Sequence, residues 1–155
     1  MKYVKGDLVK DKEISVFCHQ CNCFGKMGAG IAAQISREYP EVAAADKMNF
    51  ITRGAAGLFG TILPVKCHDG RICVNMYSQF TYGRGKRQTD YDMFKNCLDL
   101  LEGFLKDYPD AKVGFPYMIG CGLAGGDWKV VEGMIREFSE RVSNDVFIVE
   151  FTQNM

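Results

Sequence analysis

Short runs of apolar, β-branched and aromatic residues recur along the whole chain and predict six β-strands. In the last run, Val146 and Ile148 alternate with Phe147 and Val149, so both faces of that strand are apolar. A strand of this kind belongs inside a sheet that is covered on both sides. The six predicted strands are Tyr3–Leu8, Ile14–Cys18, Leu58–Val65, Ile72–Tyr77, Val113–Met118 and Val146–Phe151.

Between these runs, apolar residues recur at spacings of three and four, which indicates amphipathic helices. Two such patterns cover 91–105 and 128–142, and a third, shorter helix is expected to begin near Gly30 with Pro40 near its end. Strands interleaved with amphipathic helices predict an α/β fold, a three-layer α/β/α sandwich with a central mixed, mostly parallel sheet. No repeat or linker divides the sequence, so we expect a single domain over residues 1–155.

Two of the predicted helices carry capping signals at their starts. Thr89 with Asp92 three residues later resembles a capping box. Asp127 directly precedes the second long helical pattern and is placed to cap it.

Composition narrows the classes of function. The 155 residues are 47% hydrophobic and 12% aromatic, enough for a core without metal or disulfide support. Lys plus Arg (19) equals Asp plus Glu (19), which makes sequence-independent nucleic-acid binding an unfavourable hypothesis. The basic run Arg84, Lys86 and Arg87 is a local exception, either a small phosphate-steering patch or a plain surface loop.

The cellular context follows from the cysteines and from hydropathy. The chain has seven Cys, an odd number, and no export signal at its start, so we expect reduced and mostly buried thiols. No apolar run approaches the roughly 20 residues that span a bilayer. We expect a cytoplasmic protein that does not associate with membranes.

The most informative stretch is Cys18–Ile31, where a buried strand leads into polar residues, then glycines, then a helix. This order places free backbone N–H groups and a helix N-terminus beside the end of a sheet, where α/β proteins bind phosphorylated ligands. A tight strand-to-helix turn is the alternative. Ile119–Trp128 repeats the order of strand, glycines and helix, and two such loops in one small domain favour a ligand with a diphosphate.

Other classes of site fit less well. No Gly-Lys-Ser/Thr follows either set of glycines, and Gly28-Ala29-Gly30 lacks the third glycine of the dinucleotide fingerprint. A zinc module drawn from Cys18, His19, Cys21 and Cys23 lacks a second matched pair of ligands. A cysteine phosphatase built on Cys121 would need a following Arg that the loop does not contain. We expect no cofactor and no metal.

With these motifs in view, the chain resembles the macro domain family, in particular its branch of ADP-ribose-1″-phosphate-processing and ADP-ribosyl-glutamate-hydrolysing domains. The resemblance covers nearly the whole length. It rests on Gly6-Asp7-Leu8 after the first strand, on Cys18–Ile31 with Asn22, and on Ile119–Trp128.

The resemblance implies a ligand-binding role for each matching position. Asp7, with Leu8 beside it, would accept a hydrogen bond from the adenine amino group, although by itself Asp7 also suits a solvated turn. Asn22 would face the distal ribose, or else close its loop as an Asx-type turn. Phe151 would pack near adenine or, the interpretation that we favour, in the core. The residues that would flank the diphosphate are Gly28, Gly30 and Ile31 on one side and Gly120, Cys121, Gly122, Leu123 and Ala124 on the other.

The catalytic residues are a separate question. Related hydrolases use a mid-chain Lys and an Asp after the Gly-Cys-Gly-Leu run, where this chain has Gln79 and Ala124. Asn22 remains a candidate for orienting the distal ribose for chemistry. Asp127 is a candidate for activating water, with helix capping as its alternative, and His19 for proton exchange, with a hydrogen-bonded loop residue as its alternative.

The resemblance therefore implies a protein that binds ADP-ribose, or an ADP-ribosylated substrate, and hydrolyses a group attached to its distal ribose. Three hydrolase activities fit: an ADP-ribose-1″-phosphate phosphatase, an O-acyl-ADP-ribose deacylase and a mono-ADP-ribosyl hydrolase. The alternative is a non-catalytic reader of ADP-ribose. Nucleic acid enters only as an ADP-ribosylated substrate.

Overall fold

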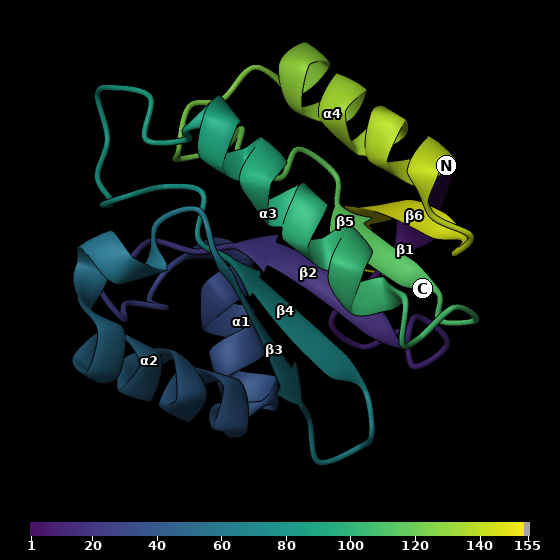
Figure 1. Cartoon of the computed structure of the whole chain (residues 1–155), viewed down its shortest axis with the longest axis horizontal. Coiled ribbons are helices and arrows are strands. Elements are labelled where there is room, and N and C mark those ends of the chain that lie inside the picture. The colour runs from purple at the N-terminus through teal and green to yellow at the C-terminus, as the bar shows by residue number, and fades with distance from the viewer. Residues whose placement is uncertain (154–155) are drawn as a thin grey trace.

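The computed structural model describes residues 1–153 and forms strands in all six segments where the apolar runs predict them (Figure 1). The predicted bounds are one to four residues off at several ends; the longest error is at Leu58, which ends a helix rather than starting a strand. The strands are β1 (Lys2–Gly6), β2 (Val16–Gln20), β3 (Ile62–Lys66), β4 (Ile72–Met76), β5 (Val113–Pro116) and β6 (Val146–Phe151).

The strands form one mixed sheet in the order β1-β6-β5-β2-β4-β3. All neighbouring pairs are parallel except β3 and β4, which confirms the expected mostly parallel sheet. β6 lies between β1 and β5, as its two apolar faces require. The sheet therefore has its most apolar strands inside and its most exposed strand, β1, at one edge.

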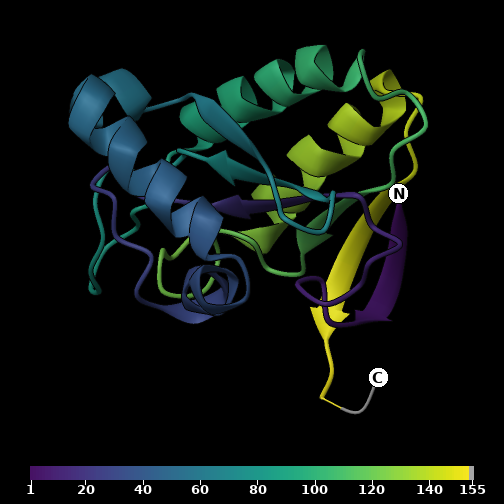
Figure 2. The same cartoon turned by 90° about the horizontal axis from the view of Figure 1, so that it is seen from below.

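Four helices cover the two faces of the sheet: α1 (Gly30–Glu38), α2 (Pro40–Leu58), α3 (Tyr91–Leu105) and α4 (Trp128–Arg141). Figures 1 and 2 show α3 and α4 on one face and α1 and α2 on the other. Alternate strand residues serve the two layers: Cys18 packs into the core under α3 and α4, whereas Phe17 packs into the core under α1. This arrangement confirms the three-layer sandwich.

The long helix α2 was not predicted, and Pro40 begins it rather than ending α1. Proline suits the first helical position because its missing N–H has no intrahelical partner there. The amphipathic pattern of α2 is weak, since its buried residues are only Val42, Asp46 and Leu58, and Gly54 interrupts it with a φ of 73°. Because one of its buried residues is a carboxylate and a glycine interrupts it, this helix does not show the apolar spacing by which helices are predicted.

The two capping predictions differ in outcome. Asp127 caps α4, because its side chain accepts a hydrogen bond from the Lys129 N–H. The capping box at Thr89 is wrong by one position: Asp90 is the N-cap of α3 and accepts from the Met93 N–H. The Thr89 hydroxyl is used elsewhere, as described below.

The cysteines are free, and all except Cys121 are buried, which confirms the prediction of reduced and mostly buried thiols. Among residues 1–153 no helix combines the length and the hydropathy needed to cross a membrane.

Candidate functional site

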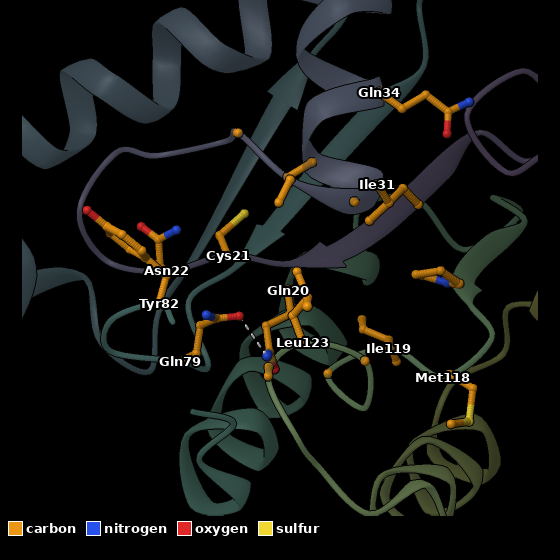
Figure 3. Close-up of a pocket in the computed structure, with 18 of the residues that line it drawn as sticks. Gln20, Cys21, Asn22, Ile31, Gln34, Gln79, Tyr82, Met118, Ile119 and Leu123 are labelled. Carbon is orange, nitrogen blue, oxygen red and sulfur yellow. Dashed lines mark hydrogen bonds between the residues drawn. The ribbon is translucent and has the colours of Figure 1, made fainter. Parts of the chain in front are cut away.

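Five of the strands run parallel, so their carboxyl ends meet at one edge of the sheet. A cavity of about 750 Å³ opens at that edge (Figure 3). Ligands of α/β proteins bind at this position because loops and helix N-termini converge there. The lining residues come from the segments 7–9, 20–34, 79–84, 116–124 and 149–151.

The first glycine-rich loop connects β2 to α1 and carries Asn22. The Asn22 Oδ1 accepts from the Phe24 N–H at 3.0 Å, and its Nδ2 donates to the Lys26 carbonyl at 2.8 Å. These bonds form the Asx-type turn that was the alternative for this residue, and they leave one amide hydrogen and one lone pair free. Asn22 also lines the cavity, so the turn holds a partly unused amide against the space where a ligand would lie.

At the end of this loop, α1 presents an uncapped N-terminus to the cavity. Ala29 is the N-cap, and no side chain bonds to the first N–H groups. Gly28, Gly30 and Ile31 line the cavity at this point. Free N–H groups at a helix start carry a partial positive charge, which suits a phosphate oxygen.

The second glycine-rich loop follows β5, and hydrogen bonds from two other segments of the chain hold it in place. Gly120 has a φ of 73°, and its carbonyl accepts from the Thr89 hydroxyl at 2.6 Å. Gln20, at the end of β2, donates to the Thr89 Oγ1 at 2.9 Å and to the Gln79 Oε1 at 3.0 Å. The Ala124 carbonyl accepts from the Gln88 N–H at 2.7 Å. These bonds give the loop one fixed backbone path facing the first loop.

Asp7 lies where β1 ends, at one end of the cavity. Its carboxylate accepts from the Val9 N–H at 3.1 Å and from the Gln34 Nε2 at 3.3 Å. Phe151 is 60% exposed and lines the same cavity, so the favoured prediction of core packing for this ring is wrong. Pro116 and Met118 also line the cavity, so this end of it is largely apolar and carries a single carboxylate.

The opposite end is richer in amides and carries two cations. Figure 3 shows Asn22, Gln79 and Tyr82 together there, on segments that follow β2 and β4. Lys26 and Arg84 also line the cavity. Among the lining residues of the described chain, Asp7 is the only carboxylate and no histidine is present.

Three predicted site residues lie outside the lining of the cavity. His19 is fully buried, its Nε2 lies 2.7 Å from the Asn75 Oδ1, and burial lowers its pKa from 6.5 to about 4. Asp127 is committed to its helix cap. The Cys121 thiol donates to the Ile119 carbonyl at 3.3 Å, and burial raises its pKa to about 11. The side chains of His19, Asp127 and Cys121 therefore do not line this cavity, and the roles predicted for the three residues stay predictions.

The other predicted residues, Asp7, Leu8, Asn22, Gly28, Gly30, Ile31, Gly120, Gly122, Leu123 and Ala124, all line the cavity, and their roles stay predictions. Sequence reasoning missed Gln20, Gln34, Lys26 and Tyr82 as lining residues. For Gln20 a signal existed, because it is the polar residue that ends a buried strand just before the first loop. Gln34 gave none, since a polar residue inside a helix usually faces solvent.

Comparison with known proteins places this geometry in a family. A scan against protein-family models finds no match. An uncharacterized 17.5 kDa protein of Enterobacteria phage T4 is 31% identical, over 97% of this chain and 96% of its own length. An ADP-ribose 1″-phosphate phosphatase of Saccharomyces cerevisiae is 28% identical, over 94% of this chain and 96% of its own length.

A solved structure gives the same answer for the fold. The macrodomain of Mycobacterium tuberculosis DarG superposes with a TM-score of 0.83 at 23% identity, over 96% of this chain and 95% of its own. The chain belongs to the macro domain family. In this macro domain, the cavity between the two glycine-rich loops is the candidate site.

Proposed function

We propose that this macro domain binds ADP-ribose 1″-phosphate and hydrolyses it to ADP-ribose and inorganic phosphate. The observation that carries the proposal is the division of the cavity into three parts. A single carboxylate follows β1 at one edge of the sheet, the two glycine-rich loops follow β2 and β5 in its middle, and the amides with two cations follow β2 and β4 toward the other edge. A base, a diphosphate and a phosphorylated distal ribose would occupy these parts in that order.

The middle of the cavity suits a diphosphate for two reasons. The uncapped start of α1 presents N–H groups from one side, and the backbone of the second loop lies on the other. The exposed glycines Gly28, Gly30 and Gly122 have no side chains to keep phosphate oxygens at a distance. Both loops would hold the ligand mainly through main-chain atoms.

The reaction proposed is a displacement at phosphorus. A water oxygen bonds to the phosphorus, the bond from phosphorus to the 1″ oxygen breaks, and one proton of that water passes to the 1″ oxygen as the phosphate leaves. Phosphoryl transfer passes through a loose transition state, so positioning and charge stabilisation supply most of the catalysis. Lys26 and Arg84 would stabilise the phosphate charge, and the free hydrogen of the Asn22 amide would orient the distal ribose.

The choice of a phosphate ester rests on the curated relative from Saccharomyces cerevisiae, whose name states that activity. It also suits the composition of the amide-rich end. Asp7 lies at the opposite end, and the Cys21 thiol beside Asn22 has a pKa that burial raises well above 9.0. A substrate that brings its own phosphate oxygens near the water needs no strong base from the protein. The free thiols also favour a reducing compartment, and we place the protein in the cytoplasm.

A non-catalytic reader is the second candidate, and one observation favours it. Gln79 and Ala124 stand where related hydrolases carry their catalytic Lys and Asp, so this chain has neither of those two catalytic side chains at these positions. A reader would bind ADP-ribose in the same cavity and leave its derivatives intact.

Phosphate release separates the two candidates. The purified protein is incubated with ADP-ribose 1″-phosphate, and inorganic phosphate is measured over time together with ADP-ribose by chromatography. A phosphatase releases both in equal amounts and over many turnovers. Arg84→Ala should slow release, whereas Lys86→Ala, on the same exposed loop but outside the lining, should not. Tight binding without phosphate release would establish the reader and refute the phosphatase.

A further inference from the structure

Arg71 is a buried cation that lies behind the lining of the cavity and is not itself a lining residue. Its side chain is on the turn into β4 and is only 3% exposed. In the described chain no carboxylate lies within ion-pair distance of its guanidinium. Burying a charge is costly unless its hydrogen bonds are satisfied, so the bonds that this guanidinium makes identify its purpose.

The guanidinium donates to three carbonyls of the segment that follows β1 and, through its Nη1, to the Tyr39 hydroxyl at 2.9 Å. Its Nη2 donates to the Leu8 carbonyl at 2.8 Å, its Nη1 donates to the Val9 carbonyl at 2.7 Å, and its Nε donates to the Ile14 carbonyl at 2.9 Å. The plane of the group also lies over the Phe17 ring, 4.1 Å from its centroid. Only arginine offers several N–H groups in a rigid fork of this kind.

One peptide unit connects Arg71 to the carboxylate in the cavity. The Leu8 carbonyl and the Val9 N–H belong to the same planar unit, with the oxygen and the hydrogen on opposite sides. Arg71 holds the oxygen, and the hydrogen is donated to the Asp7 Oδ1 at 3.1 Å. A rotation of this plane would break both bonds together, so the guanidinium fixes the direction in which Asp7 presents its carboxylate.

We propose that Arg71 is a positioning residue for recognition of the base, acting on Asp7 through the Leu8–Val9 peptide. The inference rests on the proposed function, because it assumes that Asp7 accepts a hydrogen bond from the 6-amino group of adenine. Arg71 does not touch the ligand. It determines base selectivity by holding the acceptor in place.

Base selectivity is the readout that a merely structural role would not change. Calorimetry gives the dissociation constants of ADP-ribose and of its hypoxanthine counterpart, which carries an oxygen in place of the 6-amino group. The wild type should prefer ADP-ribose, since a carboxylate accepts from the amino group and repels the oxygen. In Arg71→Met this preference should fall about tenfold, the factor that one hydrogen bond of ordinary net strength supplies.

Two further variants separate positioning from stability. Val42→Ala shortens a fully buried side chain of the same core and should lower the melting temperature while leaving the preference unchanged. Arg71→Lys keeps the charge and reaches fewer carbonyls, so its preference should lie between those of the wild type and Arg71→Met. If Arg71→Met does not fold, Arg71→Lys decides alone.

The outcomes distinguish this inference from the proposed function. A folded Arg71 variant with the preference of the wild type overturns the positioning role and leaves the proposed function intact. A wild type that binds both ligands equally overturns the role of Asp7 and the inference with it. A wild type that binds neither ligand overturns the proposed function and the inference together.

Discussion

The second glycine-rich loop allows a sharp test, because two of its glycines differ in what a methyl group would meet. Gly120 has a φ of +73°, and a Cβ there would lie 2.9 Å from the Gln20 Oε1 and 3.1 Å from the Thr89 Oγ1. Gly122 is exposed, its φ is outside the left-handed region, and a Cβ there meets no atom within 4 Å. The substitutions Gly120→Ala and Gly122→Ala are therefore a matched pair.

The expected cost of Gly120→Ala has two parts. A left-handed conformation costs a residue with a Cβ roughly 1–2 kcal/mol. Relieving the close contacts displaces Gln20 and Thr89, whose bonds to each other and to the Gly120 carbonyl are 2.9 and 2.6 Å long. Each hydrogen bond contributes about 1 kcal/mol, so the free energy of unfolding should fall by roughly 2–4 kcal/mol in total.

Urea denaturation at constant pH measures both variants. Gly122→Ala should change the free energy of unfolding by no more than about 0.5 kcal/mol. It should nevertheless weaken ADP-ribose binding, because the added methyl group occupies space beside the diphosphate. If Gly120→Ala is as stable as Gly122→Ala, the hydrogen bonds of Gln20 and Thr89 do not fix the backbone path of the loop, and the expected cost is refuted.

Four further predictions follow from the placement of single side chains. Asp7→Ala should weaken ADP-ribose binding measured by calorimetry but leave ribose 5-phosphate unaffected; equal losses for both ligands would remove Asp7 from base recognition. Asn22→Ala should lower kcat for phosphate release more than it weakens binding, whereas a reader would show an affinity loss alone. Asp127→Ala should cost about 1 kcal/mol of stability through the lost cap of α4, with turnover unchanged; lost turnover in a folded variant would return Asp127 to the chemistry. Burial lowers the pKa of His19 from 6.5 to about 4, so the unfolded chain binds more protons between these values. The free energy of unfolding should therefore fall by up to about 3 kcal/mol as the pH drops from 6.5 to 4, and His19→Gln should flatten that slope in denaturation measured across this range.

The sheet could be predicted from the sequence because its strands bury apolar residues in a regular way. β6 is apolar on both faces and lies inside the sheet, and the patterns of α3 and α4 match helices that each pack one face on it. α2 could not be predicted in the same way. Its buried Asp46 accepts a hydrogen bond from the Tyr77 hydroxyl at 2.6 Å. A contact between residues so far apart in the sequence cannot be predicted from a local pattern.

In the candidate site, too, one part could be predicted from the sequence and another could not. The glycine-rich loops were predictable because the backbone itself carries the signal, in the order of strand, glycines and helix. The side chains were harder to place. His19 precedes the first loop by only a few residues, yet it pairs with Asn75 in the sheet and faces the interior. Gln20, the next residue, lines the cavity, since successive strand residues point to opposite faces.

Arg71 shows a limit of a different kind. Its sequence neighbours mark it as the residue between a surface turn and a buried strand, where a long cation is expected to reach solvent. Its hydrogen bonds are instead to carbonyls of the segment 8–14 and to the Tyr39 hydroxyl. Only the fold brings those carbonyls together, because β1 and β4 lie far apart in the order of the sheet.

Calorimetric titration of the purified protein with ADP-ribose, with ADP and AMP as controls, tests whether this cavity binds ADP-ribose. We expect one site per chain and clearly tighter binding of ADP-ribose than of either control, because of the three ligands only ADP-ribose carries a distal ribose for Asn22 to contact. Binding of all three ligands with equal affinity would contradict a role for the amide-rich end. No heat with ADP-ribose, and no competition by it, would contradict the assignment of the cavity itself.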